Sequence, residues 1–294
     1  MPQFLDIDAA QTTDAGPGYM IPAFSFLRRV AAAASFGLLA STTTLPASAA
    51  DLSAPKTDQA SPAVPREWTL SVSPYLWAAS LNGDAGAFGF QRSVDVPFRD
   101  TLKNLNAGVM GNIEIGNGVF GAYLNGQYVD VSSDERLGRY DFGVGMRSTL
   151  VAVGAYYRVY EAALGGSTVN GTPRIFALEP TAGVRWSRMT GRLGFGSFHI
   201  SHSEGWLDPY LGMRAQLDLT DRWNLMLEGD VGGFGAGTRL SLNGQAYLGY
   251  RTELLGRPTI LRAGYRALYQ DYRDGSFQWK VTQHGPIIGA TFQF

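Results

Sequence analysis

The chain has 294 residues, a formal net charge of -1 and no cysteine. Because so balanced a charge provides no basic surface, nucleic acid is excluded as a partner, and the lack of cysteine excludes disulfides, thiolate catalysis and Cys-based metal sites. Charged residues make up 17% of the chain, aromatic residues make up 12%, and 37 residues are Gly. With a mean hydropathy of -0.07, the chain does not fit a bundle of transmembrane helices, whereas a membrane-spanning β-barrel has this kind of composition.

The N-terminal part has the three regions of a secretory signal peptide. Arg28 and Arg29 precede an uncharged apolar run, and small residues that end in Ala47 to Ala49 follow it as a cleavage pattern. The apolar run is much shorter than the roughly 20 residues that a helix needs to span a bilayer. We therefore expect residues 20–49 to be a signal peptide that is removed after export.

The segments before and after this signal peptide differ from it in composition. Residues 1–19 contain only acidic charges, whereas the start of a signal peptide is positively charged. We therefore expect translation to start at Met20, and residues 1–19 to result from a mis-assigned start. Residues 50–66 combine Pro with Ala, Ser and Thr and hold little apolar surface, so we expect a disordered periplasmic leader.

Residues 67–294 alternate between apolar and polar side chains. In the clearest run, residues 206–219, Leu207 and Leu211 share one face while Asp208 and Arg214 share the other. This run is longer than the usual 3 to about 10 residues of a globular strand. Because lipid cannot satisfy backbone N–H and C=O groups, a sheet that crosses a membrane has to close on itself. The pattern therefore predicts an all-β fold, a transmembrane antiparallel up-and-down β-barrel.

Ten strands are predicted, with eight or twelve as alternatives, and short turns alternate with longer loops along the chain. This alternation predicts that both termini lie on the periplasmic side. Residues 88–97 are a candidate additional strand, and the helical spacing in residues 98–105 predicts a short plug or cap. The ten expected strands are 67–81, 105–117, 118–132, 141–158, 174–190, 205–219, 222–235, 238–253, 258–271 and 278–294.

The C-terminal sequence, residues 290–294, alternates and ends in Phe. It resembles the terminal strand that the outer-membrane assembly machinery recognises, with Phe292 and Phe294 as the assembly signal. Together with other segments, it makes residues 67–294 similar to a poorly characterised family of proteobacterial, porin-like outer-membrane β-barrels. This resemblance implies the outer membrane of a Gram-negative bacterium, with outer-membrane lipids and lipopolysaccharide as partners, and it implies no established activity. The other segments are residues 68–77, 206–214, 221–237, 264–266 and 284–286.

Twelve charged residues fall on the face expected to point into the lumen, six of each sign. Because a barrel of this size has a narrow lumen, we expect the opposed charges to form a paired network with a structural role. The alternative is a narrow pathway for a small solute or ion, whose selectivity the Arg residues determine. We expect no cofactor and no metal. The twelve residues are Glu114, Arg147, Glu179, Arg185, Asp208, Arg214, Asp218, Glu228, Asp230, Arg251, Arg262 and Arg266.

Tryptophans lie near the ends of the predicted strands, where membrane barrels carry girdles of aromatic residues. This position predicts that their rings lie at the level of the lipid headgroups. The residues are Trp68, Trp77, Trp186, Trp206, Trp223 and Trp279.

The segment from His199 to Glu204 collects two histidines, hydroxyls and a carboxylate in an expected outer loop. The pair His199 and Ser201, with the later Glu204, resembles the nucleophile arrangement of the lipid A deacylases. A catalytic triad is a spatial arrangement that adjacency in sequence rarely supplies, so we expect a polar loop and not an enzyme. An outer-membrane enzyme that acts on lipid through this loop and a surface interaction protein that uses its outer loops remain the alternative functions.

Overall fold

The computed structural model describes residues 67–294 apart from 88–89, 138–139 and 196–197. The expected mis-assigned start, signal peptide and leader lie outside the described residues. Over the described part of the chain, no helix is long and apolar enough to cross a membrane.

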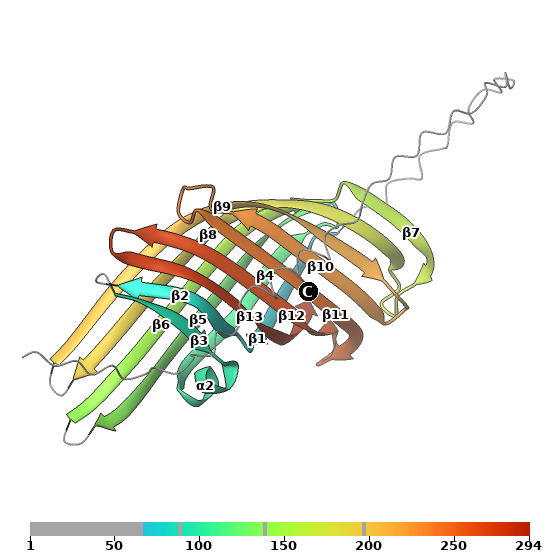
Figure 1. Ribbon diagram of the computed structural model, residues 1–294. Helices are drawn as coiled ribbons and strands as arrows, with labels where there is room; N and C mark the ends of the chain where they lie inside the picture. The colour runs from blue at the N-terminus through green and yellow to red at the C-terminus, as the bar shows by residue number, and fades with distance from the viewer. Residues whose placement is uncertain (1–66, 88–89, 138–139, 196–197) are drawn as a thin grey trace, which may run out of the picture. The chain divides into compact units, whose positions relative to one another are not determined.

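Thirteen strands form one antiparallel sheet that closes because β1 pairs with both β4 and β13 (Figure 1). β2 continues β1 along β13, and β7 continues β6 along β8, so the wall is a barrel of ten strands, as the sequence predicts. The elements are β1 Thr69–Trp77, β2 Ser80–Ala87, β3 Phe90–Val96, α2 Phe98–Lys103, β4 Leu105–Gly116, β5 Phe120–Leu137, β6 Tyr140–Tyr157, β7 Tyr160–Ser167, β8 Pro173–Phe195, β9 Phe198–Asp218, β10 Trp223–Gly232, β11 Leu240–Leu254, β12 Arg257–Asp274 and β13 Phe277–Gln293.

Tight turns connect the strands at the end of the barrel that holds Phe294. Asn117 Oδ1 accepts hydrogen bonds from the backbone N–H groups of Val119 and Phe120 at 2.9 and 3.0 Å. Gly118, with φ of 79°, supplies the left-handed conformation that this turn requires. The side-chain hydroxyl of Thr220 closes the β9–β10 turn in a similar way.

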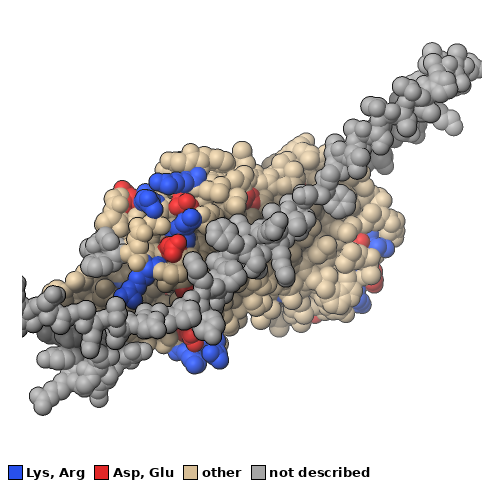
Figure 2. All heavy atoms as spheres, viewed as in Figure 1, with Lys and Arg blue, Asp and Glu red and all other residues tan. Residues whose placement is uncertain are grey.

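The opposite end of the barrel carries longer hairpins than predicted. Residues 133–140 and 191–204, expected as loops, largely continue β5, β6, β8 and β9 as paired strands. At the tight-turn end, the expected long connection at residues 159–173 is likewise mostly strand, as β7. These segments pair because the backbone ladder can extend past the apolar band, where alternation of apolar and polar side chains is no longer required. On the face seen in Figure 2, charged side chains gather toward the two ends of the barrel, and the described surface between them is mostly uncharged.

Burial follows the alternation along the strands. On β9, Asp208 and Tyr210 are 0% and 3% exposed, whereas their neighbours Leu207 and Leu211 are 50% and 59% exposed. Large apolar side chains therefore cover the outside and polar ones point inward, the reverse of a water-soluble sheet barrel. Two apolar clusters also lie inside, one around Trp77 and one around Trp206.

The predicted membrane-interface position is wrong for three of the six tryptophans. Trp77, Trp206 and Trp279 are each 4% exposed and pack in the interior clusters. The reason is strand parity, because Trp206 lies two residues from Asp208 and so shares its inward face. The others lie on the outer surface: Trp68 is 54% exposed, Trp186 39% and Trp223 41%.

The segment between the first two barrel strands forms the additional strand and the helix that the sequence suggested. β3 pairs with β2 from Leu81 and Val96 to Ala87 and Phe90. α2 then leads back to β4, and the backbone N–H of Phe98 at its start donates to Ser80 Oγ at 3.0 Å. The segment therefore lies at the edge of the sheet, beside β2 (Figure 1).

Candidate functional site: the charged interior

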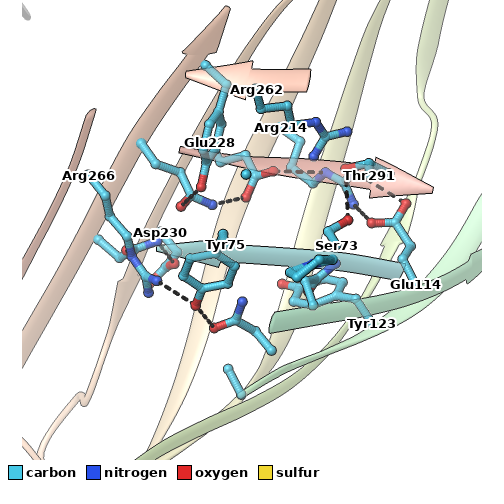
Figure 3. A pocket seen from close by; sticks show the side chains of 18 of the residues that line it. Ser73, Tyr75, Glu114, Tyr123, Arg214, Glu228, Asp230, Arg262, Arg266 and Thr291 are labelled. Carbon is cyan, nitrogen blue, oxygen red and sulfur yellow. Dashed lines mark hydrogen bonds and ion pairs between the residues drawn. The ribbon is translucent and has the colours of Figure 1, made fainter. Parts of the chain in front are cut away.

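Arg214 on β9 lies at the centre of a cluster of three carboxylates. Its cross-strand neighbours are Glu179 on β8 and Glu228 on β10, and Glu114 approaches from β4 across the lumen. The ion pairs measure 3.3 Å to Glu114, 3.6 Å to Glu179 and 3.7 Å to Glu228. The guanidinium carbon also lies 4.4 Å from the centre of the Tyr156 ring. The cluster therefore joins β4, β8, β9 and β10 through one cation. Figure 3 shows Arg214 between Glu114 and Glu228.

A second cluster forms around Arg185 and Asp230. Arg185 Nη2 donates to both carboxylate oxygens of Asp230, at 2.9 and 2.8 Å, and Nη1 donates to Ser241 Oγ at 3.0 Å. Asn243 donates to the same carboxylate at 2.9 Å and accepts from Arg266 Nε at 3.1 Å. These charge-assisted bonds fix the position of the Arg185 guanidinium, so this cluster holds β8, β10, β11 and β12 in place.

Further ion pairs lie toward the tight-turn end. Arg251 pairs with Asp218, which also accepts a hydrogen bond from the backbone N–H of Ile175 at 3.0 Å. Arg158 pairs with Glu179 at 2.7 Å and with Glu161 at 2.7 Å. Arg158 is missing from the predicted set, although it continues the inward series of even-numbered residues on β6. That parity is the signal by which it could have been found.

Asp208 and Arg262 lie inside the barrel in different roles from the paired residues. Asp208 Oδ1 accepts hydrogen bonds from the backbone N–H and the hydroxyl of Thr238, at 2.7 and 2.9 Å. It therefore fixes the connection between β10 and β11. Arg262 lines the central cavity together with Arg214 (Figure 3).

Arg147 does not point into the lumen, so this part of the prediction is wrong. It pairs in register with Asp130 on β5 and with Thr190 on β8. The next residue on β6, Ser148, and its partner on β8, Met189, are both buried inside, so the row that contains Arg147 faces outward. In residues 141–158, valines occur at even as well as odd positions, that is, on both faces of the strand. The sequence alone therefore does not show which face of this segment points inward.

On the outer wall, Asp130 holds two guanidinium groups. Arg147 Nη2 lies 2.7 Å from Asp130 Oδ2, and Arg192 Nη2 lies 2.5 Å from Oδ1. Asn106 donates to the same Oδ1 at 3.2 Å, and the Arg147 guanidinium lies 5.9 Å from the ring centre of Tyr128. The side chains of Arg147 and Arg192 keep 43% and 36% of their surface exposed.

Little open space remains at the level of the charged clusters. The cavity lined by the residues around Arg214 has a volume of about 100 Å³. Toward the long hairpins, Trp206 stacks on Tyr272 with ring centres 4.4 Å apart and planes at 15°, and Trp279 and Val281 pack beside them. A hydrated path through the lumen would have to pass both the charged clusters and this apolar layer.

The segment from His199 to Glu204 is part of strand β9 and not a loop. His202 bonds to Glu204 at 2.8 Å and its ring lies 5.9 Å from that of Phe277. Ser201 occupies the opposite face, where it and His199 line an outer cleft with Arg192. His199 and Ser201 share the outward face of β9, whereas Glu204 lies on the inward face with His202, so the strand does not bring His199, Ser201 and Glu204 together as a triad needs.

No protein-family model matches the sequence, and no curated protein matches it. Solved structures of similar shape include the outer membrane protease OmpT of Escherichia coli, with 10% identity and a TM-score of 0.46 over 78% of this chain and 97% of that one. They also include Ail, the attachment invasion locus protein of Yersinia pestis, with 10% identity and a TM-score of 0.31 over 77% and 98%. A major outer membrane protein of Thermus thermophilus has 14% identity and a TM-score of 0.33 over 78% and 100%.

Proposed function

We propose that the protein is an integral outer-membrane β-barrel whose lumen is closed to ions and solutes, and that the interior charges hold its wall together. The observation that carries this proposal is Arg214, a single buried cation held by Glu114, Glu179 and Glu228 across the lumen. A cation that bridges opposite walls of a narrow barrel occupies the space through which a solute would pass. The network is thus a structural element, and the alternative of a narrow pathway would require it to open.

The outer membrane is the proposed location because the outward face is apolar and the last strand ends in Phe. The backbone of Phe294 pairs with that of Leu70 at 3.1 and 2.9 Å, which closes the barrel at its tight-turn end, the proposed periplasmic side. The ring of Phe294 is exposed, and Phe292 is the other residue of the proposed signal for the assembly machinery. Residues that both close the barrel and identify its last strand fit this role.

A flux assay in vesicles tests the closed lumen. The folded protein is reconstituted into vesicles loaded with a potassium-sensitive dye, and swelling in small sugars is followed in parallel. We expect rates equal to those of protein-free vesicles. Sugar-dependent swelling or potassium entry from protein shown to be folded by heat-modifiable gel mobility would instead support the narrow pathway.

A second candidate function is recognition of a phosphate-bearing lipid headgroup on the outer wall, and Arg147, Asp130 and Arg192 favour it. The outward row of β8 passes from Trp186, an exposed aromatic, to Arg188 and Arg192. This order supports a position of the guanidinium groups directly beyond the apolar band, where lipid phosphates would lie. Arg is suited to phosphate because its N–H groups bind two oxygens at once, and the site carries more positive than negative charge.

Lipid-dependent stability tests this second candidate. Arg147→Ala combined with Arg192→Ala should remove the extra thermal stability that lipopolysaccharide gives over phosphatidylcholine vesicles. Arg99→Ala, in an exposed residue of α2 outside the cluster, is the matched control and should keep it. An unchanged lipopolysaccharide effect in the double variant would exclude the site.

A further inference from the structure

The wall of the barrel has a lateral gap between β1 and β4. These strands pair from Thr69 and Gly116 only as far as Pro74 and Gly111, although β4 continues along β5 as far as Leu105. Beyond Pro74, the chain stays on β13, first through the end of β1 and then through β2. The upper part of β4 therefore has no ladder partner on this side among the described residues, and α2 lies over the gap.

A cavity of about 350 Å³ fills this gap and reaches the interior of the barrel. This volume lies within the roughly 300–1,000 Å³ that ligand sites occupy. Its inner wall carries three methionines from three strands, Met110, Met146 and Met189, together with Val129 and the ring of Trp77. Methionine side chains are flexible and polarizable, so they adapt to apolar ligands of different shape.

The mouth of the cavity opens on the outer surface. Leu76 and Ile288 line it and are 64% and 57% exposed, and both lie on the outward face of their strands. Leu102 of α2, 55% exposed, forms the upper rim. Since the outward apolar face contacts lipid in a membrane barrel, the cavity is reached from the membrane and not from water.

Two polar groups lie among these apolar residues with no partner in the described part of the chain. Gln127 is 5% exposed and its Oε1 accepts no hydrogen bond, and Trp77 is 4% exposed and its Nε1 donates none. Both residues line the cavity. Buried polar atoms are normally paired, so an unpaired acceptor and an unpaired donor beside one apolar cavity favour a ligand with a group that both donates and accepts.

We propose that this cavity binds a small apolar molecule that carries one hydroxyl or carboxyl group and enters from the membrane between β1 and β4, beneath α2. The apolar part packs against the three methionines, and the polar end bonds to Gln127 and Trp77. Residues of the central charge cluster take no part, so this site is independent of whether the lumen conducts.

Photolabelling of matched glycine variants tests the proposal. Gly108 lines the cavity, and a Cβ there would lie at ordinary contact distances of 3.7 and 3.8 Å from Leu105, so Gly108→Phe fills the cavity without backbone strain. Gly126 on β5 faces outward and has no heavy atom within 4 Å of an added Cβ, so Gly126→Phe is the matched control. The probe is a ten-carbon fatty acid with a diazirine at its chain end, added to vesicles that contain the folded protein at acidic pH, where its carboxyl group is protonated and can donate to Gln127 Oε1 and accept from Trp77 Nε1.

In the wild type and in Gly126→Phe, mass spectrometry should find the label on Met110, Met146 or Met189. In Gly108→Phe, this labelling should fall at least about tenfold while labelling of Ile288 on the outer wall persists. Labelling confined to outward side chains in the wild type, or unchanged interior labelling in Gly108→Phe, would overturn the proposal.

Gln127→Leu tests the polar end separately. The wild type should be labelled more strongly by the fatty acid than by a diazirine alkane of equal length, by a factor of about ten for one hydrogen bond to a buried group. In Gln127→Leu the two probes should label equally. A preference for the acid that survives in Gln127→Leu would show that Gln127 does not bind the polar end.

Discussion

Replacing Arg214 by Met tests the structural role of the interior charges directly. The substitution removes one cation that lies 3.3, 3.6 and 3.7 Å from three carboxylates. Each pair at such a distance is worth about 4–5 kcal/mol of gross Coulomb energy at an effective dielectric constant of 20, and the desolvation of the ions offsets much of this. Glu179 keeps Arg158 as a partner at 2.7 Å, so Glu114 and Glu228 bear the loss.

We expect Arg214→Met to lower the free energy of unfolding by about 3–5 kcal/mol, the usual cost of leaving one partner of a buried ion pair uncompensated. Urea unfolding in vesicles, followed by tryptophan fluorescence and gel mobility, measures this change. The triple variant Arg214→Met, Glu114→Gln and Glu228→Gln also removes the two carboxylates that would lose their ion pair with Arg214, and it should recover most of the loss. Arg222→Met, in the exposed β9–β10 turn, is the control and should match the wild type.

Two results would refute the reasoning about Arg214. A single variant as stable as the wild type would mean that water or conformational change satisfies the carboxylates. A triple variant less stable than the single one would mean that the loss comes from packing of the Arg214 side chain against Tyr156 and not from charge.

Three further substitutions test the orientation of the wall and the packing of the interior. Trp206→Ala should lower the free energy of unfolding by about 3–5 kcal/mol because it removes a buried ring that stacks on Tyr272. Trp186→Ala, on the outer face, should lower it clearly less. Equal losses would contradict the inward position of Trp206. Leu211→Arg should lower the free energy of unfolding in vesicles by about 2–4 kcal/mol because Leu211 faces lipid. Leu255→Arg, at a turn residue that is 95% exposed, should leave this free energy unchanged. Gly183→Ala should lower the free energy of unfolding by about 1–3 kcal/mol because the new Cβ would clash with the carbonyl oxygen of Val153 and the hydroxyl of Tyr210. A variant as stable as the wild type would show that β6 and β8 lie further apart than described above.

The strands could be predicted from the sequence because lipid imposes one rule on all of them. Residues 105–117 and 238–253 are predicted within two residues of β4 Leu105–Gly116 and β11 Leu240–Leu254. Inside the membrane, each outward position has to be apolar, so the period of two is continuous and the turns interrupt it clearly. Beyond the membrane that rule ends, and for this reason the sequence predicts a loop where β8 and β9 form a hairpin.

The candidate site could be predicted only in part. The alternation along a strand shows which face a side chain is on, but it does not show which residue of another strand that side chain contacts. Most of the inward charges follow from alternation, but the prediction for Trp206 rests on its distance from a strand end, which says nothing about the face. The partner of each charge depends on side chains that cross the lumen, such as Glu114 to Arg214. The cavity beside Trp77 depends on where β1 leaves β4, and this long-range pairing leaves no local signal.

Single-channel recording tests the central claim of a closed lumen most directly. The purified, folded protein is inserted into planar bilayers and compared with Glu228→Ala, which frees one face of Arg214. Silence from the wild type over the voltage range in which the bilayer is stable is the result that a sealed charge cluster predicts. Stable conductance steps from the wild type, shifted in size by Glu228→Ala, would contradict it and show an aqueous path lined by this cluster.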